Sequence, residues 1–178
     1  MISLWKYYIK NIEQRPLLTK ALTGVVFSYF GDFICQKVIE KSEFNHVRSK
    51  VFCSYGLVEA VIGGHFWLNF LEKFFGSKRT LRNALIKTTV DVGLFAPFDL
   101  LLFITWTNRL ENSTQSLREK ITKDYLVTYM DSLVFYIPTS VICFYNISSK
   151  YRVPFLCASS LVWDIFMSFA THNSLKSV

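Results

Sequence analysis

The chain has 178 residues, of which 51% are hydrophobic and only 19% are charged. Soluble domains carry roughly 25% charged residues, so the composition favours a single integral membrane domain over residues 1–178. The net charge of +7 comes from Lys and Arg in patches that flank apolar segments. Such patches are typical of helix ends near lipid phosphates, and nucleic-acid binding, which needs a polar basic face, is not expected.

The first element predicted is an amphipathic helix over residues 2–13. Its apolar residues recur at helical spacing, namely Trp5, Tyr8, Ile9 and Ile12, and its charges up to position 12 are lysines. Such a helix lies at a membrane surface. A basic segment of this kind is equally typical of a mitochondrial targeting sequence, and the sequence leaves both interpretations open.

Five apolar stretches follow, at about 17–39, 51–75, 85–107, 126–147 and 154–171. A bilayer core takes about 20 helical residues, so four stretches are long enough and the last is short. Backbone polar groups in lipid must bond within the segment, which requires helices. The predicted fold class is all-α: a multi-span transmembrane helical bundle with four to five membrane helices plus the N-terminal amphipathic helix. Basic residues divide almost evenly between the two sides, so no orientation is predicted.

Small residues in the first two stretches recur three or four positions apart, which places them on one helix face. They are Gly24, Ser28, Gly31, Gly56, Ala60 and Gly64. Helices in lipid associate through close backbone approach, which small side chains allow. These residues are therefore predicted to pack the first two membrane helices together.

Two prolines interrupt later stretches, Pro97 in the third and Pro138 in the fourth. Proline has no backbone N–H and its ring clashes with the carbonyl four residues earlier. Helix kinks are expected at both positions, with the carbonyls of Gly93 and Val134 losing their helical partners.

Acidic residues inside the apolar stretches are the candidate functional residues. A charge at mid-bilayer costs about 2.5–3.5 kcal/mol even on the more lenient scale, so these side chains should turn inward. They would either line a pore that favours cations or form an intramembrane polar network. The candidates are the acids Asp32, Glu59, Asp91, Asp99 and Asp164, together with Gln36, which lies one helical turn from Asp32. Asp131, near the start of its stretch, is instead expected at the membrane interface.

Catalytic motifs are lacking. The histidines His46, His65 and His172 form no H-E-x-x-H pattern, and neither a G-x-S-x-G motif nor a phosphate-binding glycine loop occurs. The four cysteines form no C-x-x-C pair and are expected to be packing residues. The sequence predicts no enzyme, no metal site and no cofactor.

Several short motifs, in order along the chain, resemble the family of the twenty-two-kilodalton peroxisomal membrane protein and the mitochondrial inner-membrane protein Mpv-seventeen. The motifs span nearly the whole chain: Trp5, Pro16, Gly31-Asp32 with Gln36, Gly63-Gly64 with Trp67 and Leu71, Asp91 with Gly93 and Phe95-Ala96-Pro97, Pro138, Tyr151-Arg152, and Trp163 with Ser168. The fourth stretch departs from the family, with Ile137 at the position of the family's tryptophan and Val141 at the position of its glutamine. This chain is a diverged member by that resemblance.

The resemblance implies a protein of the mitochondrial inner membrane or, alternatively, the peroxisomal membrane, usually with four spans and linked to small-solute permeation. The leading hypothesis is a small-solute channel or pore-like transporter that contributes to organelle metabolite homeostasis, with Asp32, Gln36, Asp91 and Asp164 facing the path. The alternative is a non-conducting scaffold that organises lipids or proteins. The expected partners are the lipid bilayer, an unidentified small solute and, as an open option, further copies of the chain in a homo-oligomer.

Overall fold

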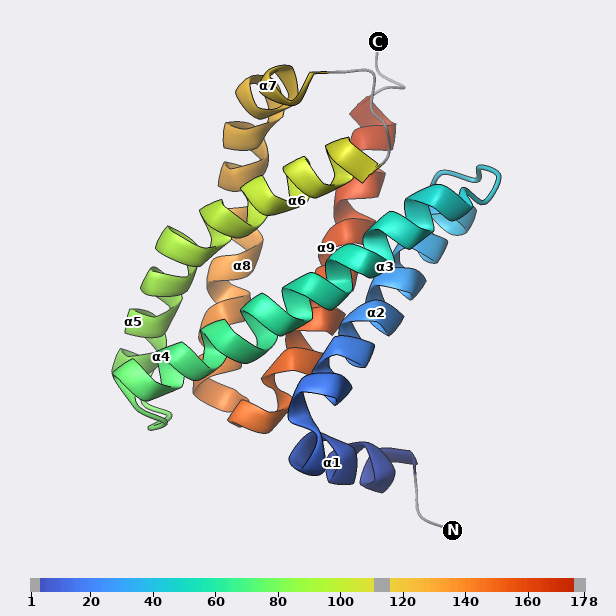
Figure 1. Ribbon diagram of the computed structural model, residues 1–178. Coiled ribbons are helices and arrows are strands. Elements are labelled where there is room, and N and C mark those ends of the chain that lie inside the picture. The colour runs from blue at the N-terminus through green and yellow to red at the C-terminus, as the bar shows by residue number, and fades with distance from the viewer. Residues whose placement is uncertain (1–3, 111–115, 175–178) are drawn as a thin grey trace.

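The structure is a computed structural model that describes residues 4–110 and 116–174, and within these residues the chain is helical and has no strand. The α-helices, labelled in Figure 1, are α1 (Leu4–Gln14), α2 (Pro16–Ile34), α3 (His46–Val61), α4 (Leu68–Phe75), α5 (Leu81–Val90), α6 (Ala96–Leu110), α7 (Leu117–Lys120), α8 (Leu126–Asn146) and α9 (Arg152–Ser174). Short π-helical turns connect successive helices without a break at η2 (Ile62–Trp67), η3 (Asp91–Phe95) and η4 (Ile121–Tyr125), and a further one, η1 (Cys35–Ile39), ends α2. A 3₁₀ turn, η5 (Ser149–Tyr151), precedes α9.

Four helical segments of the described chain are long and apolar enough to cross a membrane: Pro16–Ile39, His46–Phe75, Leu81–Leu110 and Leu126–Asn146. The fifth apolar stretch forms α9, which packs beside α2. Many large apolar side chains point outward, as a lipid-facing surface requires; Phe66, Leu94 and Val134 are 61%, 67% and 80% exposed. The predicted all-α multi-span bundle is confirmed.

The second and third spans begin several residues before the apolar stretches, because polar residues cap them. The Asn45 side chain accepts hydrogen bonds from the backbone N–H groups of Val47 and Arg48, at 3.0 and 3.1 Å. Thr80 caps α5 by accepting from the N–H of Asn83 at 3.3 Å. Such caps satisfy backbone donors that a helix start leaves free, so the helices extend beyond the apolar residues that predicted them.

The N-terminal helix α1 lies across one end of the bundle, as predicted for an amphipathic segment. Ile12 is buried, whereas Lys6 and Lys10 are exposed. The Tyr8 hydroxyl lies 3.2 Å from Oγ1 of Thr23 on α2. The apolar face of α1 therefore packs on the bundle and its lysines face outward.

The closest helix contact joins α2 to α3, where the small residues meet. A Cβ built on Gly24 would lie 2.7 Å from Cβ of Ala60, and it would also strike the carbonyl oxygen of Gly56. A Cβ on Gly56 would in turn strike the Ser28 side chain and lie 2.9 Å from the carbonyl oxygen of Gly24. No side chain larger than hydrogen fits at either glycine without a shift of the helices.

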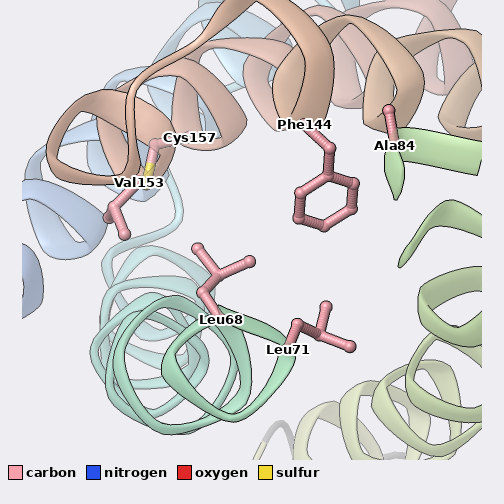
Figure 2. Packing of buried hydrophobic residues seen from close by; sticks show 6 residues of the cluster. All are labelled: Leu68, Leu71, Ala84, Phe144, Val153 and Cys157. Carbon is pink, nitrogen blue, oxygen red and sulfur yellow. The ribbon is translucent and has the colours of Figure 1, made fainter. Parts of the chain in front are cut away.

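The bundle has two ends, defined by its loops (Figure 1). The loop between α2 and α3 lies at one end, and the loops before α5 and before α9 lie at the other, together with α1. We call these the α2–α3 end and the α4–α5 end. At the α4–α5 end, side chains from α4, α5, α8 and α9 form the buried apolar cluster shown in Figure 2, which consists of Leu68, Leu71, Ala84, Phe144, Val153 and Cys157.

The π-helical turn η3 changes the expected effect of Pro97. In this turn the Ala96 N–H bonds to the carbonyl of Asp91, five residues back rather than four. The carbonyl five residues before Pro97 is that of Val92, and Pro97 has no N–H to donate to it. The Tyr129 hydroxyl donates to this carbonyl oxygen at 2.7 Å, so a tyrosine of α8 replaces the missing backbone bond. Pro138 lies within α8.

Candidate functional site

A cavity of about 670 Å³ lies inside the bundle, between α3, α6, α8 and α9, with part of α2 at its edge. It extends from Glu40 and Arg48 at the α2–α3 end to Leu68 and Leu156, beside the apolar cluster. Pockets of 300–1,000 Å³ are typical of small-molecule sites. The cavity is large enough for a small solute, and the apolar cluster lies between it and the α4–α5 end.

Three of the predicted acidic residues line this cavity: Glu59 of α3, Asp91 of η3 and Asp99 of α6. Asp91 accepts a hydrogen bond from the Trp67 indole N–H at 2.7 Å and one from the Ser140 hydroxyl at 3.1 Å. Asp99 accepts from the Tyr55 hydroxyl at 2.6 Å. Neutral donors on neighbouring helices thus fix both aspartates without cancelling their charge.

Glu59 differs from the two aspartates, because no hydrogen bond to its carboxylate is found among the described residues. The described ion pairs also leave out Glu59, Asp91 and Asp99. Arg48 is a cation on the cavity lining, and it pairs with Asp32 and Glu40, each at 2.9 Å. The middle of the cavity therefore carries three carboxyl groups that have no cationic partner among the described residues.

Asp32 and Gln36 belong to an intramembrane polar network, which was the alternative to a pore lining. Both are buried, at 2% and 1% exposure, and the Gln36 amide donates to Asp32 at 2.7 Å. Asp32 also accepts from the Ser49 hydroxyl and pairs with Arg48. Gln36 accepts from the backbone N–H of Asn45. Neither residue is part of the cavity lining; together they fix the α2–α3 end of the bundle.

The remaining predicted residues are Asp164, Asp131, Gly31 and Gly64. The side chain of Asp164 lies outside the described part of the chain. Asp131 is exposed on the outer face of α8. Among the small residues, Gly31 is buried in α2, and a Cβ on Gly64 would lie 3.0 Å from Cγ2 of Val153 on α9. Gly64, which lies in η2, therefore packs against α9.

The sequence analysis did not predict the ion pairs of Glu72. Glu72 of α4 pairs with Lys87 of α5 at 2.6 Å and with Arg152 of α9. Lys87 and Arg152 are each only 1% exposed, and both lie near the Phe144 ring, with Nζ of Lys87 5.8 Å and Cζ of Arg152 5.1 Å from its centroid. A signal was present, since Glu72 and Lys87 are opposite charges within apolar stretches. Which residues pair, however, depends on helix packing across 80 residues of sequence.

No group of three or more His, Cys, Asp or Glu side chains in the described residues is arranged to hold a metal ion. The four cysteines form no disulfide in the described structure, with Cys35, Cys143 and Cys157 buried in the helix packing and Cys53 half-buried. The site is thus a cavity with hydrogen-bonded carboxylates and aromatic walls.

Comparison with known proteins finds relatives of the chain. A family model described as the Mpv17 / PMP22 family matches residues 108–168. Relatives match nearly the whole length: PXMP2/4 family protein 1 of Dictyostelium discoideum is 28% identical over 94% of this chain and 84% of the relative. The chain is thus similar to members of the Mpv17 / PMP22 family over most of its length, and the family model itself covers residues 108–168.

Relatives named for two different organelles are similar to this chain. Peroxisomal membrane protein PMP22 of Arabidopsis thaliana is 27% identical over 93% of the chain and 88% of its own length. Mitochondrial inner membrane protein Mpv17 of Rattus norvegicus is 26% identical over 97% of the chain and 99% of its own length. No solved structure matches. The Mpv17 / PMP22 family is one of organelle membrane proteins, in agreement with the four candidate spans.

Proposed function

We propose that this protein, which is similar to members of the Mpv17 / PMP22 family, is a small-solute channel or pore-like transporter that favours cations, and that its path runs through the cavity between α3, α6, α8 and α9. In this proposal the chain is not an enzyme and acts within the lipid bilayer. The observation that carries the proposal is the presence of three carboxylates, without a cationic partner among the described residues, on the wall of one cavity of about 670 Å³.

The energetic argument concerns the cost of these charges. Carboxylates within a membrane are expensive and mark substrate or ion pathways. A purely structural role would be served by ion pairs, as at Asp32 and at Glu72. Glu59, Asp91 and Asp99 instead face open space inside the bundle, where a passing cation would supply the missing countercharge.

The path is closed at one end in the structure. Leu68 belongs both to the cavity wall and to the apolar cluster, and Leu71 and Phe144 lie beyond it toward the α4–α5 end. Solute passage therefore requires these side chains to move apart. The proposal predicts an open state in which the cluster separates, and low conductance when it is packed.

The test is the current carried by purified protein in a planar bilayer under a KCl gradient. The reversal potential is expected to show a preference for K⁺ over Cl⁻. The triple variant Glu59→Gln/Asp91→Asn/Asp99→Asn is expected to lose that preference. Asp131→Asn is the matched control, because it removes one carboxylate from the outer face of α8, and it should leave the reversal potential unchanged.

Two results contradict the proposal. Protein that is folded and inserted but carries no current supports a non-conducting scaffold instead. An unchanged reversal potential in the triple variant removes the three carboxylates from the path.

For the cellular location, we propose the mitochondrial inner membrane, with the peroxisomal membrane as the alternative. The basic, amphipathic α1 supports the first, since a helix of this kind is typical of mitochondrial targeting sequences. Imaging of the tagged full-length protein against markers of both organelles distinguishes them, and peroxisomal signal alone contradicts the choice.

A further inference from the structure

We propose that the cavity binds small organic ammonium ions, with Glu59 as the counter-ion and aromatic rings around the alkyl groups. This inference deepens the proposed function by naming the class of solute, and it rests on the same cavity. It depends on how the carboxylates and rings are arranged rather than on the number of charges alone.

The charge of the ligand follows from the ionisable groups on the wall. These are Glu40, Glu59, Asp91 and Asp99 against Arg48, and Arg48 is already paired with Glu40 and Asp32. A cavity of this sign attracts cations and repels anions. The ligand is therefore positively charged.

An organic cation fits better than a metal ion. Metal ions require several ligating groups at one point, and no such group exists in the described chain. Asp91 and Asp99 are also already engaged, by Trp67 with Ser140 and by Tyr55. Glu59 is left as a single carboxylate, which suits one ammonium group and not a multiply coordinated metal.

Aromatic rings border the open carboxylate. Trp67 and Phe95 stack with centroids 5.1 Å apart, and both line the cavity. Gly63 lies in η2, about one turn after Glu59: a Cβ there would be 2.8 Å from Cζ of Phe95 and 3.1 Å from Oε1 of Glu59. The absence of a side chain at Gly63 thus leaves the Phe95 ring edge close to the Glu59 carboxylate.

A second aromatic group lies farther along the wall. The Phe103 ring packs edge-on to Tyr55 with centroids 5.0 Å apart, and both residues line the cavity with Trp163 of α9. Cations bind over aromatic faces, and quaternary ammonium groups in particular are bound by surrounding rings. Apolar rings beside one carboxylate therefore select a charged group that carries alkyl substituents over a compact, strongly hydrated ion.

The experiment uses choline and its uncharged carbon isostere, 3,3-dimethyl-1-butanol, as probes. Full-length protein is placed in nanodiscs of phosphatidylethanolamine and phosphatidylglycerol, which contain no choline headgroup, and binding is measured by calorimetry. Choline is expected to bind at least about tenfold more tightly than the isostere, a difference of about 1.4 kcal/mol. Glu59→Gln should weaken choline binding by about the same factor.

Two variants serve as controls. Asp131→Asn keeps the cavity intact and should leave choline affinity unchanged. Glu59→Asp keeps the charge and should retain most of the affinity, so a loss of binding in Glu59→Gln would not reflect a misfolded protein. Equal binding of choline and its isostere, or equal choline affinity in Glu59→Gln and the unaltered protein, overturns the inference.

The proposed function is tested separately by K⁺ flux into liposomes that contain the same protein. K⁺ flux without choline binding overturns the ammonium site and leaves the conduit standing. Choline binding that depends on Glu59 without any K⁺ or choline flux supports the site and overturns the conduit.

Discussion

Replacing Glu72 by Gln is expected to destabilise the protein strongly, because one carboxylate neutralises two buried cations. Lys87 and Arg152 are each 1% exposed, and both pair with Oε1 of Glu72. The variant leaves the two cations with neutral acceptors, the carbonyl of Gly76 for Lys87 and that of Ile147 for Arg152. Neutral acceptors do not replace the lost charge.

The magnitude follows from this geometry. Removing one partner of a buried ion pair costs about 3–5 kcal/mol. Glu72 itself retains 16% side-chain exposure, so we take the lower value of about 3 kcal/mol. For a chain of this length that corresponds to a fall in Tm of about 6–12 °C.

The assay is thermal unfolding in detergent micelles, followed by tryptophan fluorescence. Glu40→Gln is the matched control, since it makes the same chemical change at a pair with Arg48 whose side chains are 24% and 28% exposed. Exposed pairs contribute about 0–1 kcal/mol, so this Tm should fall by a few degrees at most. If Glu72→Gln and Glu40→Gln melt together, the argument from buried charge is wrong.

The other predictions concern helix contact and the cavity wall. Gly56→Ala should lower stability by about 1–3 kcal/mol, because its methyl group overlaps α2. The control Gly93→Ala places its methyl group in open space and should not lower stability. Equal Tm values for the two variants would contradict the close crossing of α2 and α3. Trp67→Phe keeps a ring beside the cavity but removes the donor to Asp91, which should cost about 1.5–3 kcal/mol. Trp106→Phe removes a hydrogen bond to a neutral hydroxyl and should cost about 0.5–1.5 kcal/mol in the same thermal assay. A larger loss of stability in Trp106→Phe than in Trp67→Phe would count against a charged Asp91.

The fold could be predicted from sequence because apolar length alone identifies membrane helices. The same information did not give the helix starts, which depend on caps at Asn45 and Thr80. Spacing of small residues also indicated which faces of the first two spans could pack, since that property belongs to single helices. What could not be predicted was every feature that requires knowing which helices are neighbours.

The candidate site illustrates that limit. Composition indicated that the intramembrane acids turn inward, but it could not separate Asp32, which meets Ser49 and Arg48, from Glu59, which faces the cavity. Each residue carries the same charge in a similar apolar setting along the chain. The difference lies in the partner helix, as it does for Glu72 and Arg152.

The π-helical turn η3 has a consequence for the rotation of the helix around its axis. Asp91 and Asp99 are eight positions apart, and at 3.6 residues per turn they would point about 80° away from each other. The extra residue in the turn makes this spacing equivalent to seven, which reduces the divergence to about 20°. Both carboxylates can then face the same cavity. Deleting a single residue from the turn after Asp91 would leave the two aspartates seven positions apart in a regular α-helix, so both carboxylates would still face the same side.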